Sequence, residues 1–135
     1  MVAAADPSHW LYRLTSAEWL AAADTELEHC AQALARRAVR PGVTYARRAA
    51  GMALNAVLRG QDDPDARYGR SYMEHVAALG DDEQAPAEVR IAAQSLRTMA
   101  PAPPALITLG KPDLRALEAA RVVVGHARAQ VSENG

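Results

Sequence analysis

Residues 49–58 read AAGMALNAVL, a stretch whose only polar side chain is that of Asn55. Because successive residues of an α-helix point about 100° apart, ten of them cover every side of a helix. A helix that is apolar all round is buried, since any face turned toward water would expose hydrocarbon. The stretch therefore predicts a central helix, from about Val43 to Leu58, that Gly60 to Pro64 end. Asn55 is expected to hydrogen-bond across helices and fix their register.

The composition of the whole chain favours the same architecture. Of the 135 residues, 31 are Ala and none is Phe, and strand-forming residues other than Val are scarce. Ala is the best helix former, and its small side chain lets neighbouring helices approach closely. A chain of this length fits one domain. We therefore expect a single domain over residues 1–135, with 1–14 as an N-terminal anchor segment and 132–135 as a frayed tail.

Start and stop signals predict four helices besides the central one. Thr15 and Glu18 have the spacing of a capping box at the start of the first helix, and Pro41 with Gly42 separates the first two helices. The expected spans are Thr15 to Arg40, Val43 to Leu58, Ser71 to Gly80, Pro86 to Met99 and Pro112 to Val131. Residues 101–110 are expected to be extended or irregular. The prediction is an all-α fold, a four- or five-helix up-and-down bundle.

Charge and cysteine content limit the kinds of function. The formal net charge of −1 gives no overall support for binding RNA or an anionic membrane, since both favour strongly basic surfaces. No apolar stretch is long enough to span a bilayer, and the N-terminus lacks the pattern of a secretion signal. The single Cys30 excludes an internal disulfide. We expect a cytoplasmic protein that binds no membrane, and the Ala- and Arg-rich composition indicates a bacterial one.

No set of His, Cys, Asp and Glu residues shows the spacing of metal ligands with a third partner. His9 and His29 are isolated in the sequence. The sequence therefore predicts no metal site and no cofactor.

The stretch from Arg48 to Leu58 resembles the second helix of HEPN domains, which is rich in small residues. The order of the expected helices, with Trp19 and Leu20 in the first, is similar to that of HEPN domains over residues 15–131. The resemblance implies a four- or five-helix bundle that forms a homodimer. In ribonuclease members of that family, an Arg and a His separated by four to six residues are thought to act on RNA.

Two pairs in this chain have that spacing, Arg70 with His75 and Arg121 with His126. A chain of this composition yields roughly one such pair by chance, so the spacing alone establishes neither pair. Within one regular helix, residues five apart point about 140° apart. Arg121 and His126 would therefore converge only across a dimer.

The densest group of polar and aromatic residues surrounds the first pair. It consists of Tyr68, Arg70, Tyr72 and His75. On a functional interpretation, Arg70 holds a phosphate and His75 transfers a proton. On a structural interpretation, Ser71 caps a helix, Tyr72 packs inward, and both Arg70 and His75 are solvated.

A second candidate binding surface is basic. Five arginines flank the expected turn between the first two helices: Arg36, Arg37, Arg40, Arg47 and Arg48. They suit an RNA, a phosphate or an acidic partner, and a solvated charged surface is the ordinary alternative. The acidic loops around Asp62 and Asp82 are expected to be solubilising turns.

Three functions are compatible with these features. The leading hypothesis is a non-catalytic HEPN-like bundle that binds a partner protein or a nucleotide through the two candidate surfaces. The second is a metal-independent ribonuclease, the toxin of a toxin–antitoxin pair, with Arg70 and His75 as its catalytic residues. The third is a structural scaffold that self-associates.

A homodimer is also expected from the distribution of apolar residues. The central helix is apolar all round, and the last helix carries Val122 and Val123 beside the stripe assigned to the core. A symmetric dimer is the commonest way for a protein to cover such an excess.

Overall fold

The computed structural model describes residues 10–61, 68–100 and 112–134. Over these ranges the chain forms five α-helices and one 3-10 turn, and no strand, which confirms the all-α prediction. The elements are η1 (Trp10–Arg13), α1 (Ser16–Ala35), α2 (Val39–Arg59), α3 (Tyr72–Asp81), α4 (Ala87–Thr98) and α5 (Arg115–Asn134). The predicted irregular segment 101–110 lies outside the described residues.

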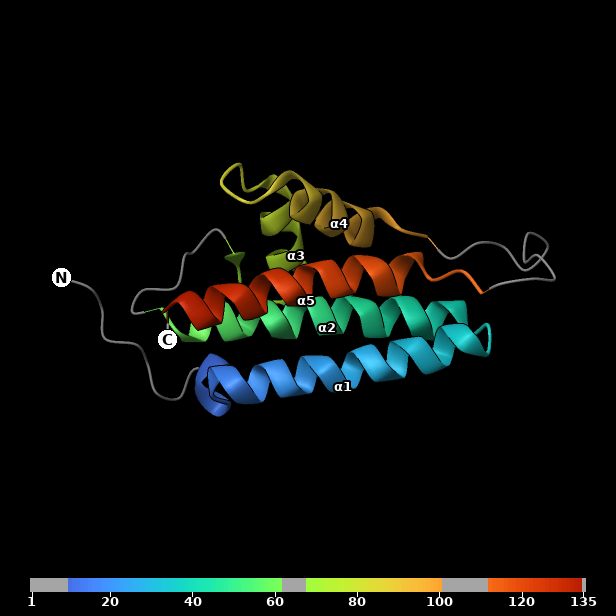
Figure 1. The fold of residues 1–135 in the computed structure, drawn as a ribbon, viewed down its shortest axis with the longest axis horizontal. Coiled ribbons are helices and arrows are strands. Elements are labelled where there is room, and N and C mark those ends of the chain that lie inside the picture. Colours follow the sequence, from blue (N-terminus) through green and yellow to red (C-terminus); the bar gives the residue numbers. More distant parts are fainter. Residues whose placement is uncertain (1–9, 62–67, 101–111, 135) are drawn as a thin grey trace.

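The helices form two layers (Figure 1). The long helices α1, α2 and α5 lie side by side and form what we call the long-helix layer. The two short helices α3 and α4 pack against α2 and α5 and form the short-helix layer. Neighbours α1 and α2 are antiparallel, whereas α5 runs in the same direction as α2 because the α3–α4 pair intervenes between them. Helix α2 contacts all four other helices, as the apolar stretch predicts.

Helix α1 begins at the predicted capping box. The backbone N–H of Glu18 donates to Thr15 Oγ1 at 3.1 Å, and the backbone N–H of Thr15 donates to Glu18 Oε1 at 3.0 Å. These bonds satisfy two donors that the first turn of a helix leaves open. Ser71 caps α3 in a similar way, because its Oγ accepts from the N–H of Glu74 at 3.1 Å.

The predicted boundary between the first two helices is wrong. Helix α1 ends at Ala35, and α2 begins at Val39, so Pro41 and Gly42 lie inside its first turns. Proline is tolerated there because first-turn N–H groups lack an acceptor within the helix. Gly42 permits a close approach of α1, since a Cβ at this position would lie 2.4 Å from Leu34 Cδ2.

Two other expectations need correction. Helix α5 continues to Asn134, so residues 132–134 of the expected frayed tail are helical. It starts at Arg115 rather than at Pro112, and the carboxylate of Asp113 accepts the Arg115 N–H at 3.1 Å. The described part of the N-terminal segment does contact the bundle, because Leu11 is buried and its carbonyl accepts from Trp19 Nε1 at 3.0 Å.

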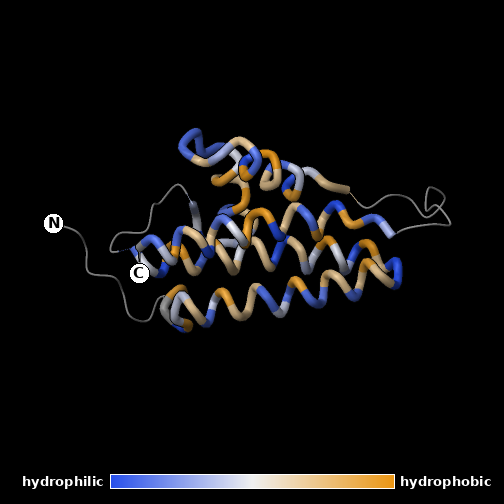
Figure 2. Tube along the Cα trace, in the orientation of Figure 1, coloured by the Kyte–Doolittle hydropathy of each residue, from blue (hydrophilic) through white to orange (hydrophobic). Residues whose placement is uncertain are grey.

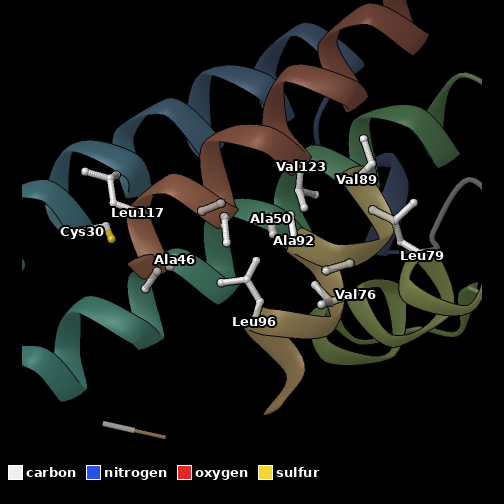
Figure 3. Close-up of a cluster of buried hydrophobic side chains, with 14 of the residues drawn as sticks. Cys30, Ala46, Ala50, Val76, Leu79, Val89, Ala92, Leu96, Leu117 and Val123 are labelled. Carbon is white, nitrogen blue, oxygen red and sulfur yellow. The ribbon is translucent and has the colours of Figure 1, made fainter. Parts of the chain in front are cut away.

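The core consists of two clusters of buried side chains that meet at α2. The larger cluster joins α2 to α3, α4 and α5 and extends to Cys30 on α1 (Figure 3). The smaller cluster joins α1, α2 and α5 and contains Trp19, Ala23, Ala53 and Val124. Ala53 is fully buried, as expected for a residue in the middle of the apolar stretch 49–58.

The apolar surface that motivates the dimer prediction is largely covered within one chain. Val123 is fully buried in the larger cluster, and the other helices cover α2. Among the described residues, the large apolar side chains left exposed are Ile91, Leu114 and Val122. Ile91 lies on α4, Val122 lies on α5, and Leu114 directly precedes α5. They do not form one contiguous apolar face, so the homodimer stays a prediction. None of the described helices is both long and apolar enough to cross a membrane.

Candidate functional site

The structure does not bring Arg70 and His75 together as a catalytic pair. Arg70 is exposed, whereas His75 is fully buried. The His75 Nδ1 is hydrogen-bonded to the backbone carbonyl of Tyr68, which identifies Nδ1 as the donor. Burial lowers the pKa of His75, against the opposing effects of this hydrogen bond and of Glu74. The imidazole is therefore a neutral core group at pH 7, which agrees neither with the catalytic interpretation nor with a solvated His75.

Tyr72 packs inward, as the structural interpretation of this cluster states. Its side chain fills the space above Gly51, where an added Cβ would lie 2.2 Å from Tyr72 Cβ. Burial raises the pKa of Tyr72, partly offset by the nearby charge of Arg48. Gly51 thus sets the distance between α2 and α3.

Asn55 lies one turn beyond Gly51 and is fully buried. The expected hydrogen bond across helices is absent, because neither amide atom has a partner among the described residues. An amide buried in this way carries a desolvation cost that no bond offsets.

The two candidate arginines of α2 serve structural roles on different faces. Arg47 donates from Nε to the carbonyl of Leu96 and from Nη2 to the carbonyl of Met99, both at 2.8 Å. These carbonyls belong to the end of α4, where backbone acceptors lack partners within the helix. Arg48 instead lies 3.4 Å from the Oε1 of buried Glu26. The predicted basic surface is therefore divided.

The structure places a cleft of about 310 Å³ between the end of α2, the turn after α3, and α5. Its apolar lining comes from Leu54, Val57, Leu58, Leu79 and Ala85. Its polar lining comes from Gln61, Tyr68, Asp82, Gln84, His126 and Gln130. The turn that carries Asp82 and Gln84 is the most hydrophilic part of the short-helix layer (Figure 2).

Asp82 is the organising residue of the cleft. It ends α3 with an extended backbone conformation, and its Oδ1 accepts the N–H of Gln84 at 3.0 Å. Its Oδ2 accepts the hydroxyl of Tyr68 at 2.8 Å. The carboxylate is therefore held in place by the chain on both of its oxygens.

His126 contributes the second titratable group of the cleft. The side chain is half-buried, and burial lowers its pKa while Asp82 and Glu133 act in the opposite direction. It is therefore mainly neutral at pH 7. Arg121, its predicted partner, is exposed and does not line the cleft. Because the described lining holds no Arg or Lys, Asp82 supplies its only full charge.

Sequence reasoning names two residues of this cleft as candidates, Tyr68 and His126, but does not place them together. It interprets Asp82 as part of a solubilising turn and His126 as half of an Arg–His pair. The lining residues range from Leu54 to Gln130 and meet only because α3 and α4 cross the long helices. No local spacing signals that meeting.

Comparison with protein-family models, with curated proteins and with solved structures gives no match. The HEPN resemblance therefore stays a prediction. Among the described residues, no group of three or more His, Cys, Asp and Glu side chains is arranged to hold a metal ion.

Proposed function

We propose that this protein is a non-catalytic helical bundle that binds a small molecule in the cleft organised by Asp82. The observation that carries the proposal is the convergence of polar side chains from α2, the α3–α4 turn and α5 around an apolar lining. Ligand sites in proteins place polar groups beside an apolar surface, and this cleft has both, with six polar and five apolar side chains among its described lining residues.

The size and rigidity of the cleft support a small ligand. Its volume of about 310 Å³ is at the lower end of the range for ligand pockets. The bonds from Tyr68 and Gln84 to Asp82 fix the carboxylate before any ligand arrives. Such pre-organisation reduces the entropy lost on binding.

The lining favours a ligand other than a nucleotide. Phosphate groups are bound by Arg or Lys side chains or by helix N-termini, and no Arg or Lys is among the described lining residues. The described lining contains no Ser, Cys or Lys, and its carboxylate and phenol are hydrogen-bonded to each other, which favours binding over covalent catalysis.

Binding can be tested by two-dimensional NMR of the 15N-labelled full chain against a library of small fragments. We expect some fragments to shift the amide resonances of Tyr68, Asp82 and His126 in a saturable way. The variant Val57→Phe, which places a ring in the cleft, should abolish these shifts. Val122→Phe adds the same ring at an exposed position of α5 outside the cleft and should leave them unchanged.

Two outcomes would contradict the proposal. One is that no fragment shifts the resonances of the lining residues. The other is that Val57→Phe, shown to be folded by its dispersed spectrum, binds the same fragments as the unmodified chain. A fragment that shifts only the amide resonances of Ile91 and its neighbours on α4 would instead indicate a surface for a partner protein.

A further inference from the structure

We infer that the ligand of this cleft is a small organic cation, a primary or secondary amine with a short apolar body. The inference rests on the proposed function, because it names the chemistry of the ligand at the same site. It predicts that the ammonium group lies at Asp82 and that the hydrocarbon lies on the apolar side of the lining, where Val57 is the accessible side chain.

The first argument is charge. Asp82 is the only fully charged side chain in the described lining, and its contacts within the chain are with the neutral Tyr68 hydroxyl and the Gln84 N–H. Arg97 of α4 is paired with the neighbouring Asp81 at 3.7 Å. Among the described residues, no Arg or Lys is paired with the Asp82 carboxylate, and a partly buried charge is stabilised by an opposite one.

The second argument is the balance of hydrogen-bond donors and acceptors. A carboxylate offers about four acceptor positions, of which the chain occupies two at Asp82. Tyr68 donates its single hydroxyl hydrogen to Asp82, so this donor is already used within the chain. A neutral His126 and the side-chain carbonyls of the glutamines add further acceptors. An ammonium group carries two or three N–H donors and no acceptor, which complements such a site.

The third argument separates an organic cation from a metal ion. A bare metal ion would need several oxygen ligands around one point, and the described residues offer no such group. Nearly half of the lining residues are instead apolar: Leu54, Val57, Leu58, Leu79 and Ala85. An apolar surface of this kind is stabilised by contact with hydrocarbon.

The test compares three probes of matched size in NMR titrations: butylammonium, 1-butanol and butanoate. We expect butylammonium to shift the amide resonances of Tyr68, Asp82 and His126. It should bind about tenfold more tightly than butanol, because a hydrogen bond to a charged group is stronger than one between neutral groups. Butanoate should not bind. Sodium chloride at equal ionic strength is the reference for a cation without an apolar body.

Matched variants locate the charge that binds the probe. Asp82→Asn keeps the size of the side chain and should weaken butylammonium binding about tenfold while leaving butanol binding unchanged. Asp24→Asn removes the same charge from an exposed position paired with Arg128 and should bind the probe normally. Tyr68→Phe provides a second variant that leaves the carboxylate intact and should weaken binding less than Asp82→Asn.

The outcomes distinguish the inference from the proposed function. If butanol or butanoate bound at the cleft as tightly as butylammonium, the inference that the ligand is a cation would be wrong. The proposal that the cleft binds a small molecule would remain. If sodium ions shifted the same amide resonances to the same extent, the inference that the ligand has an apolar body would be wrong. Unchanged butylammonium binding in Asp82→Asn would overturn the role of the carboxylate. If neither the probes nor any library fragment shifts the lining residues, the proposed function fails as well.

Discussion

The long-helix layer and the short-helix layer are stabilised in different ways. Helices α1, α2 and α5 have 20, 21 and 20 residues, and they bury apolar side chains such as Trp19, Ala53 and Val124 along their length. Helices α3 and α4 have only 10 and 12 residues. Helices this short are marginal on their own, so they depend on contacts with the rest of the chain.

Several of those contacts are bonds from side chains to backbone carbonyls. Arg47 binds the carbonyls at the end of α4, Gln94 Nε2 donates to the carbonyl of Gly80 at 2.8 Å, and His75 is bonded to the carbonyl of Tyr68. The short-helix layer is therefore rich in polar groups close to the core. The comparison teaches that the polar cleft forms where the short helices and their turn meet the long helices.

The largest expected effect is the loss of an apolar anchor of the short-helix layer. Leu96 of α4 is fully buried in the larger cluster, so Leu96→Ala should lower the free energy of unfolding by about 2–5 kcal/mol. Leu114→Ala, at a position that is 37% exposed, should cost much less. Urea denaturation followed by circular dichroism measures both, and equal costs would mean that α4 is not anchored at Leu96.

The matching substitution in the long-helix layer adds volume instead of removing it. Ala53 is fully buried between α1 and α5, so Ala53→Leu should overpack this contact and lower the free energy of unfolding by about 1–3 kcal/mol. Ala129→Leu on the exposed side of α5 serves as the control. An unchanged urea midpoint for Ala53→Leu would show that the long helices are not in close contact there.

A pair of glycines tests the contact between the layers. Gly51→Ala should be destabilising by about 1 kcal/mol, because overpacking against Tyr72 costs more than the added helix propensity provides. Gly125 lies in α5 with no atom within 4 Å of an added Cβ, so Gly125→Ala should stabilise by about 0.5–1 kcal/mol. Thermal unfolding measures both changes, and a stabilising Gly51→Ala would contradict the close approach of α3.

The smallest expected effect is the pH dependence of stability. Burial lowers the pKa of His75 and of His126, so the unfolded chain binds protons first as the pH falls. The free energy of unfolding is therefore highest above about pH 6.5. Below that pH it decreases, by at most about 1.4 kcal/mol per pH unit for His75. The contribution of the half-exposed His126 is smaller because solvent screens it.

Urea unfolding between pH 7 and 5.5 measures this slope. His126→Gln should reduce it. Stability that rises on acidification would show that these imidazoles are not buried in their neutral form.

The features that sequence predicts correctly depend on neighbours along the chain. The capping box of Thr15 and Glu18 needs residues three apart, and the burial of nine of the ten residues 49–58, all but Val57, follows from their composition. The boundary at Pro41 fails because the same residue either ends a helix or begins one, and only the packing of Gly42 on Leu34 decides between them.

The candidate site depends on distant residues, and sequence reasoning therefore finds little of it. Arg70 and His75 are close in sequence, yet one faces solvent and the other the core. Asp82 and His126 are far apart in sequence and line one cleft. The helical period alone does not predict which turn reaches which helix, because that depends on the crossing of α3 and α4 over the long helices.

The single cysteine makes this chain its own kinetic probe. Cys30 is fully buried, and burial raises the pKa of its thiol to about 11 despite the opposing charge of Arg121. A thiol-specific reagent reacts with the thiolate, so labelling requires both exposure and ionisation of this one sulfur. The rate of labelling in native buffer therefore reports how often α1 separates from its neighbours, at a natural residue and without an engineered label.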